Sequence, residues 1–226
     1  MIPWNRLSRA SIPGGGGELL LLERNGEFVI RAGGRELMTS RAHASEEELG
    51  ALAAAALGAR QAPRVLVGGL GMGYTLAAAL RTLGPGAELV VAELVPEVVA
   101  WNRGPLGHLA GHPLRDPRVR VRELDVAAEI REARGAYDAI VLDVDNGPEA
   151  LTRRGNDWLY GRSGLGAAFA ALRPGGLLAV WSASAAAPFA RRLRAAGFRV
   201  EESHLPAASG GRGGRRVVWL ALRLPS

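Results

Sequence analysis

The chain has 226 residues, 48% of them hydrophobic, and a formal net charge of +6. This composition predicts a globular protein with a substantial core. No apolar run approaches the roughly 20 residues that a membrane span needs, and Met1–Gly17 has no apolar segment of the kind found in signal peptides. The absence of cysteine excludes disulfides, thiolate metal sites and a cysteine nucleophile, and it agrees with a cytoplasmic enzyme.

The positive charge is concentrated toward the C-terminus. Every basic residue is Arg, and residues 151–226 carry 12 of them against 3 acids. A basic region of this kind can attract nucleic acid. However, the arginines are scattered, and aromatic residues, which serve as stacking platforms for single strands, make up only 5% of the chain. We therefore do not expect tight nucleic-acid binding.

The first 60 residues predict an arm, a small β-meander and a helix. Residues 1–17 end in Gly14–Gly17 and are expected to be a loose arm. Three short strands are expected at 18–24, 27–32 and 35–38. Asn25-Gly26 is a strong signal for a two-residue hairpin turn because both residues tolerate positive φ. Ser45 and the acids after it read as a capping box that opens a helix to about Gly58.

From Pro63 to the C-terminus, strands alternate with helices. Strands are expected at 64–67, 88–92, 118–122, 139–142, 177–181, 198–203 and 217–222, and helices at 74–82, 96–103, 164–172 and 186–196. Such alternation predicts an α/β fold with a mostly parallel sheet covered on both faces. The last two strands are separated only by the loop Gly210–Arg216, so they cannot both be parallel. An antiparallel last strand is typical of the class I methyltransferase (Rossmann-like) fold. We expect the chain to divide into an N-terminal part, residues 1–60, with the arm, the meander and the helix, and a main domain, residues 61–226.

A glycine turn follows the first of these strands. Gly69, Gly71 and Gly73 let the backbone approach a ligand closely, and the helix that follows offers free N–H groups. Alone, this motif equally suits a dinucleotide-binding domain. Glu93 makes the interpretation of this motif more specific. It ends the next strand, where a carboxylate can accept hydrogen bonds from both ribose hydroxyls of a nucleoside. Its alternative role is that of a surface acid near a helix start.

Acidic residues also end the next two strands. Asp125, followed by Val126, comes after the third strand and can accept the amine of adenine; its alternative role is to cap the helix that follows. Asp143, Asp145 and Asn146 end the fourth strand, where they predict substrate binding or acid–base chemistry, or an Asx turn. Three strand ends thus predict a site for S-adenosylmethionine or its decarboxylated form.

The order of these motifs resembles the spermidine synthase family. The glycine turn, Glu93, Asp125 and the strand end Asp143 to Pro148 follow the family's order, and a small β-domain precedes them, so the resemblance runs from about Glu18. It implies that Glu93 binds ribose, that Asp125 lies near adenine and that Asp143 is the catalytic acid–base.

The chain departs from the family where the transferred group binds. Gly71 stands where the family has an Asp, Thr75–Ala78 replaces an Arg-Glu pair, and the family's amine-binding Tyr has no clear counterpart near His43. A diamine needs clustered carboxylates, so we expect little or no spermidine from putrescine.

These features predict an enzyme, with three functional hypotheses. The first is an S-adenosylmethionine-dependent methyltransferase with an unidentified small-molecule acceptor. The second is a polyamine aminopropyltransferase that uses decarboxylated S-adenosylmethionine, and the third is a non-catalytic nucleoside-binding or interaction protein. Tyr160 is a candidate for substrate binding or for packing beneath a loop. We expect a homodimer that binds neither a membrane nor a metal; His108 and His112 lack a carboxylate partner.

Overall fold

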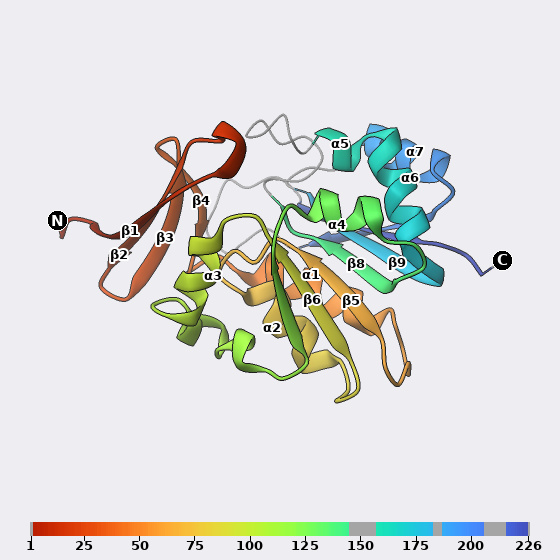
Figure 1. Ribbon diagram of the computed structural model, residues 1–226, viewed down its shortest axis with the longest axis horizontal. Coiled ribbons are helices and arrows are strands. Elements are labelled where there is room, and N and C mark those ends of the chain that lie inside the picture. Colours follow the sequence, from red (N-terminus) through yellow and green to blue (C-terminus); the bar gives the residue numbers. More distant parts are fainter. Residues whose placement is uncertain (1, 145–156, 183–186, 206–215, 226) are drawn as a thin grey trace.

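The computed structural model describes residues 2–144, 157–182, 187–205 and 216–225. Its first four strands form an antiparallel sheet in the order β1-β2-β3-β4 (Figure 1). Their bounds are Asn5–Ser11 for β1, Glu18–Arg24 for β2, Glu27–Ala32 for β3 and Arg35–Thr39 for β4. Asn25 and Gly26 have positive φ angles of 52° and 77°, as a tight turn between β2 and β3 requires. The predicted meander is confirmed, with one additional strand.

The additional strand, β1, lies in the segment that was expected to be a loose arm. It pairs antiparallel with β2, from Asn5 opposite Glu23 to Ser11 opposite Glu18. The expectation was wrong because β1 is an edge strand in which only Ala10 is buried. Its sequence therefore has no hydrophobic alternation, and backbone pairing with β2 holds it in place.

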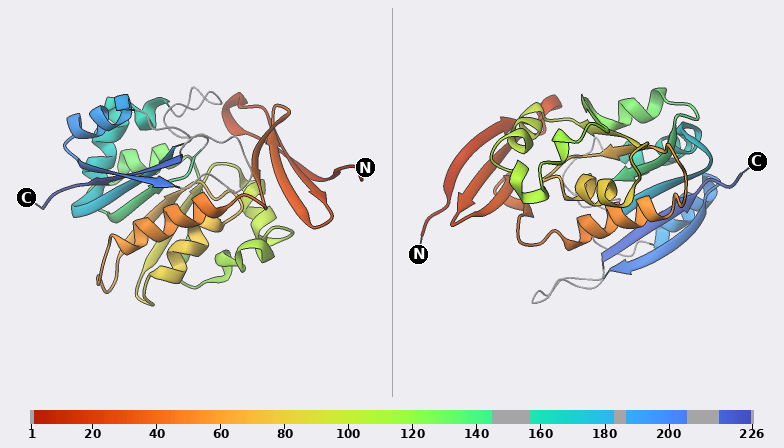
Figure 2. Two further views of the ribbon diagram at one scale, coloured as in Figure 1. Left: turned by 180° about the vertical axis from the view of Figure 1, so that it is seen from behind. Right: turned by 90° about the horizontal axis from the view of Figure 1, so that it is seen from below.

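A second, seven-stranded sheet forms the larger part of the molecule (Figure 2). Its strand order is β10-β11-β9-β8-β5-β6-β7. The bounds are Arg64–Gly68 for β5, Glu88–Glu93 for β6, Val119–Glu123 for β7, Tyr137–Leu142 for β8, Leu172–Ser182 for β9, Arg199–Leu205 for β10 and Arg216–Leu222 for β11. Strands β5 to β9 pair in parallel, whereas β11 pairs antiparallel with both β9 and β10. The predicted α/β fold with an antiparallel last strand is confirmed.

Helices cover both faces of this sheet. Their bounds are Ala44–Ala55 for α1, Tyr74–Thr82 for α2, Pro96–Arg103 for α3, Val126–Glu132 for α4, Asp157–Tyr160 for α5, Arg162–Ala171 for α6 and Ala187–Ala195 for α7. Helices α1, α2 and α3 share one buried core with the N-terminal sheet, and α4, α6 and α7 form a second core on the opposite face. None of the helices in the described residues is both long and apolar enough to cross a membrane.

Helix α1 does not begin with the predicted capping box. His43 occupies the N-cap position, and within the described residues its side chain makes no capping hydrogen bond; Ser45 lies inside the helix. The Ser45 side chain is buried, and its hydroxyl lies 3.4 Å from the guanidinium of Arg216, which donates to it. Because the helix already begins at Ala44, Ser45 does not occupy the N-cap position from which a serine hydroxyl caps the first turn. The helix also ends earlier than expected, at Ala55.

Strand β9 is longer than the predicted strand at 177–181. Tyr137 of β8 pairs with Leu172, and the register then shifts before Ala139 pairs with Leu177. The Arg-Pro-Gly-Gly sequence at 173–176, which was expected to separate a helix from a strand, is therefore an irregular part of one strand. Gly175 accommodates this irregularity with a φ of 76°.

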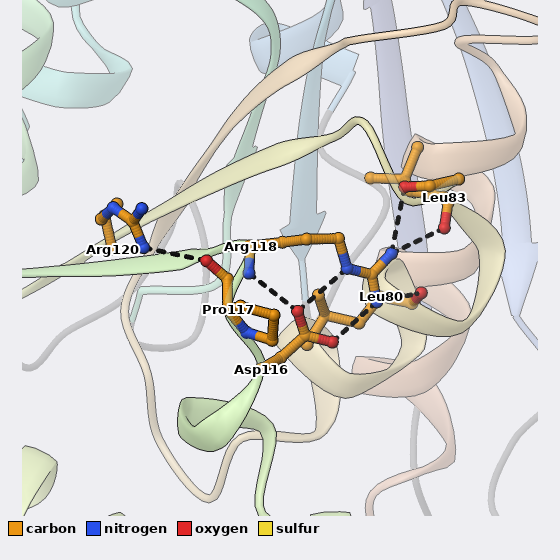
Figure 3. A network of polar contacts seen from close by, with 7 residues as sticks. Leu80, Leu83, Asp116, Pro117, Arg118 and Arg120 are labelled. Atoms are coloured by element: carbon orange, nitrogen blue, oxygen red, sulfur yellow. Dashed lines mark hydrogen bonds and ion pairs between the residues drawn. The ribbon is translucent and has the colours of Figure 1, made fainter.

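Arg118 fastens the end of α2 to the start of β7 (Figure 3). Its guanidinium donates hydrogen bonds to the main-chain oxygens of Leu80, Leu83 and Gly84, at 3.1, 2.8 and 3.1 Å. It also pairs with Asp116 at 2.8 Å, and this hydrogen bond holds the pKa of Asp116 below its ordinary value. Carbonyl groups at a helix C-terminus lack hydrogen-bond donors within the helix, and Arg118 provides donors for these three oxygens.

Candidate functional site

The carboxyl ends of neighbouring parallel strands converge on one cleft. Gly69 and Gly71 after β5, Glu93 at the end of β6, Asp125 after β7 and Asp143 after β8 all line it. Its volume is about 150 Å³. The opposite wall is apolar and comes from the N-terminal part of the chain, namely Ile12, Leu19, Ile30, Leu37 and Met38. The structure therefore brings together the three acids that the sequence placed at separate strand ends.

Two positions of the turn favour glycine, because the backbone there has a positive φ angle and a Cβ atom would meet a close neighbour. Gly69 has a φ of +86°, and a Cβ there would lie 2.7 Å from the main-chain oxygen of Asp143. Gly71 has a φ of +53°, and a Cβ there would lie 3.0 Å from Cε of Met38. Asn102 of α3 holds the turn from behind, since its amide nitrogen donates to the Gly71 oxygen at 2.8 Å. A side chain at either glycine would narrow the cleft.

Gly73 lies deeper than the other two glycines. It occupies the N-cap position of α2, and a Cβ there would meet Asn102 and Pro113 at 3.0 and 3.2 Å. Among the described residues, the lining of the cleft includes Gly69 and Gly71 but not Gly73. Gly73 thus shapes the turn, and its predicted contact with a cofactor stays a prediction.

Glu93 is buried and rigidly held at the floor of the cleft. Its side chain accepts hydrogen bonds from the backbone N–H of Leu70 at 2.9 Å and from that of Val95 at 2.8 Å. Glu93 therefore ties the glycine turn to β6, and its residue lines the cleft.

Asp125 caps a helix, as one of its two predicted roles requires, and its contact with adenine stays a prediction. Its carboxylate accepts a hydrogen bond from the N–H of Ala127 at 2.8 Å and caps α4, and the residue also lines the cleft beside Val126. The capping bond goes to Oδ1. The cap fixes the direction of the side chain.

Asp143 is held by Thr75 at the far end of the cleft. Thr75 Oγ1 lies 2.6 Å from Asp143 Oδ2 and 3.2 Å from the main-chain oxygen of Glu46. Thr75 donates to Asp143 at the shorter of these distances, and a hydroxyl has only one hydrogen to donate. Burial raises the pKa of Asp143, and the hydrogen bond from Thr75 opposes that rise.

A second cavity, of about 250 Å³, lies on the other side of Asp143. We call it the acidic cavity. It shares Leu37, Met38 and Asp143 with the cleft, and its remaining lining is Glu36, Thr39, Ala42, Ser45, Glu46, Trp181 and Arg216. Burial, followed by the charge of Asp143, raises the pKa of Glu46 to about 9. Glu46 and Asp143 thus both line the acidic cavity, and their like charges oppose ionisation of both groups together.

Solved structures share this architecture over the whole chain. The spermidine synthase from Thermotoga maritima superposes with a TM-score of 0.78 at 17% identity, covering 100% of this chain and 75% of that one. A spermidine synthase in complex with the transition-state analogue AdoDATO gives a TM-score of 0.76 at 17% identity, with the same coverage. A probable spermidine synthase from Corynebacterium glutamicum gives 0.64 at 14% identity, covering 98% and 80% of the two chains. The chain has the spermidine synthase fold.

No protein-family model and no curated protein sequence matches the chain significantly. The superpositions on solved structures confirm, at the level of fold, the resemblance that the sequence motifs indicated. In this spermidine synthase fold, the small N-terminal sheet and the carboxyl edge of the large sheet together enclose the cleft.

The sequence analysis missed Glu46, which was grouped with its neighbours as an acid of the capping box. A signal was present in the spacing, because Leu49, Gly50 and Ala53 lie three, four and seven residues further along and form the buried face of α1. An acid on the apolar face of a helix indicates a functional or paired carboxyl. Arg216 was also missed, since it was expected in a loop, whereas it begins β11.

Among the described residues, Tyr160 and His43 are not part of the lining of the cleft. Tyr160 is 3% exposed, and its hydroxyl donates to the main-chain oxygen of Val144 at 3.4 Å. It therefore supports the backbone beside the cleft, and its role in substrate binding stays a prediction. Asp145 and Asn146 lie outside the described residues. His43 stacks on Tyr74, with ring centroids 4.1 Å apart, and its Nδ1 lies 3.4 Å from a carboxylate oxygen of Glu47.

Glu46 predicts a pH dependence of stability. Its pKa is about 9 in the folded chain against an ordinary value of 4.5. Its stabilising protonated form is fully present below about 4.5, and the stabilisation is lost as the pH rises toward 9, because the unfolded chain ionises first. Glu46→Gln should therefore raise the melting temperature at pH 8 by several degrees, since about 1 kcal/mol corresponds to roughly 2–4 °C in a chain of this size.

The measurement is a series of thermal melts between pH 5 and pH 8. The gap between Glu46→Gln and the wild type should shrink toward pH 5. Asp143, Glu47 and Arg216 are the charged groups that act on Glu46, and all three remain in the variant. Glu48→Gln is the matched control, since Glu48 is exposed on the same helix. A difference in melting temperature between wild type and variant that stays the same at every pH would show that Glu46 ionises normally.

Proposed function

We propose that the chain is an adenosyl-sulfonium-dependent alkyl transferase of the aminopropyltransferase type. Its donor is decarboxylated S-adenosylmethionine and its acceptor is an amine. The observation that carries the proposal is the pair of carboxyl groups in the acidic cavity, Glu46 and Asp143, of which Asp143 also lines the neighbouring cleft. A spermidine synthase of the same fold binds the transition-state analogue AdoDATO, which supports a related ligand here.

The residues of the cleft fit an adenosyl group. Glu93 and Asp125 bring carboxylates into the lining of the cleft, where this type of group accepts hydrogen bonds from ribose hydroxyls and from the adenine amine. The apolar wall of Ile12, Leu19 and Ile30 suits the flat faces of a nucleoside. The sulfonium would then lie toward Asp143, at the end of the cleft that opens into the acidic cavity.

The reaction needs alignment and one proton acceptor. The lone pair of the acceptor nitrogen forms the new C–N bond, while the electron pair of the breaking C–S bond goes to sulfur and leaves a neutral thioether. The nitrogen loses one proton, which the Asp143 carboxylate takes. The raised pKa of Asp143 moves it toward the working pH, where a general base is most effective. Holding donor and acceptor in line supplies most of the remaining rate enhancement.

Methyl transfer from S-adenosylmethionine is the second candidate. Met38 packs against Gly71, where the resemblance to spermidine synthases expected an Asp near the transferred chain. An apolar contact at this point is less suited to the amine of an aminopropyl group than a carboxylate is. However, Glu46 supplies a carboxyl from a different element, α1, and this favours the first candidate.

The two candidates differ in the thioether that they release. We expect methylthioadenosine from decarboxylated S-adenosylmethionine in at least one of two separate incubations, one with putrescine and one with 4-aminobutyrate. S-adenosylhomocysteine should not form from S-adenosylmethionine with either amine. Chromatography of the adenosyl products reads out both reactions without requiring the acceptor to be known in advance. Release of S-adenosylhomocysteine alone would establish methyl transfer instead, and release of neither thioether would remove both candidates for these amines.

A further inference from the structure

The acidic cavity is lined by charges of both signs. Its described lining contains the acids Glu36, Glu46 and Asp143 and the cation Arg216. Within the described residues, the guanidinium of Arg216 forms no ion pair with a carboxylate; its hydrogen bond goes to the Ser45 hydroxyl at 3.4 Å. Arg216 nevertheless acts on Glu46 electrostatically and opposes the rise of its pKa. A cation and an acid thus line the same cavity without touching.

The topology of the sheet explains how Arg216 reaches this cavity. Strand β11 runs antiparallel to β9, and its second residue, Val217, pairs with Ser182 at the end of β9. An antiparallel strand begins at the edge where parallel strands finish. The first residue of β11 is therefore placed at the same edge as Asp143, which follows β8. The Ser45 hydroxyl of α1, which also lines the cavity, accepts a hydrogen bond from the guanidinium.

We propose that the acceptor is an amino-carboxylate, a molecule that carries an anionic group as well as the amine that is alkylated. This inference rests on the proposed function and specifies its acceptor. The amine faces Asp143 and Glu46, and the carboxylate pairs with Arg216. A zwitterion of this kind satisfies the acid pair and the guanidinium together.

A diamine satisfies only one side of the cavity. Its first ammonium group lies at the carboxyl pair, but its second lies where the other charged groups of the described lining are Arg216 and the solvent-exposed Glu36. Like charges repel more strongly in a partly desolvated cavity than in water. Charge-assisted bonds between a guanidinium and a carboxylate are in turn strong and often bidentate. The cavity therefore discriminates in favour of the amino-carboxylate.

The test measures binding with the protein saturated by methylthioadenosine. Calorimetric titration compares the ω-amino acids from glycine to 6-aminohexanoate with diamines of matched length. We expect the best amino acid to bind at least about tenfold more tightly than its matched diamine. Arg216→Gln should abolish this preference, and Arg216→Lys should retain part of it. Arg191→Gln, at an exposed position on α7, is the control for the change in net charge.

The outcomes separate this inference from the function on which it rests. The acceptor assignment is wrong if methylthioadenosine binds and the diamine then binds as tightly as the amino acid. It is also wrong if Arg216→Gln leaves the preference unchanged while Arg216→Lys and the control are folded. In both cases the proposed function stands. If methylthioadenosine does not bind at all, the proposed function is rejected, and the acceptor assignment is rejected with it.

Discussion

Asp143→Asn should reduce alkyl transfer by about 10²–10⁴-fold, the usual contribution of a general base. Asparagine has the size of aspartate, and its amide oxygen can accept from Thr75 Oγ1, so the contact seen at 2.6 Å can persist. It cannot take the proton that the attacking amine must lose. The rate of methylthioadenosine release measures the effect, and calorimetry with methylthioadenosine checks that binding of the nucleoside is retained.

Glu97→Gln is the control for this prediction, because it removes one negative charge from an exposed position on α3. It should leave the rate unchanged. The pH profile adds a second readout: the wild-type rate should fall as the pH drops below the raised pKa of Asp143, since the protonated carboxyl cannot act as a base. A variant that retains full activity would remove Asp143 from the chemistry and leave it only the structural contact with Thr75.

Glu93→Ala should weaken methylthioadenosine binding and also destabilise the protein. The loss of charge-assisted hydrogen bonds to ribose is expected to cost about 1.5–3 kcal/mol of binding free energy, or roughly 10- to 150-fold in affinity. The buried N–H groups of Leu70 and Val95 also lose their acceptor, and each unsatisfied group costs about 1–3 kcal/mol of folding free energy. The substitution should therefore produce a binding defect and a folding defect together.

The matched control is Glu88→Ala, at the opposite end of the same strand. Glu88 is half exposed, and its carboxylate lies 3.3 Å from Arg64. An exposed pair of this kind is worth at most about 1 kcal/mol. Calorimetric titration measures binding, and urea unfolding measures stability. Wild-type affinity in a folded Glu93→Ala protein would show that the carboxylate faces the glycine turn alone and makes no contact with a ligand.

Strand ends were the part of the site that local sequence could predict. A buried parallel strand followed by an acid is a short-range pattern, so Glu93, Asp125 and Asp143 were identified and the structure places them on one cleft. The edge strand β1 was missed because its pairing with β2 depends on backbone groups, which leave no hydrophobic pattern.

The acidic cavity could not be predicted from local patterns. Glu46 and Arg216 are 170 residues apart in the chain, and they line the same cavity only because α1 packs against the antiparallel strand β11. Each residue also had an adequate local explanation, as a capping acid and as part of an arginine-rich loop. The role of each depends on the other, and that dependence exists only after folding.

The apolar wall of the cleft has a consequence for how the molecule unfolds. Ile12, Leu19, Ile30, Leu37 and Met38 contribute no chemistry, yet they close one side of the space between the two sheets. A ligand held there would be in contact with both sheets at once, so its binding free energy would be lost if either sheet opened. Occupancy would therefore join the two sheets into a single cooperative unit, and the protection of β2 and β3 amides against hydrogen exchange would report occupancy of a site to which these strands contribute no polar group.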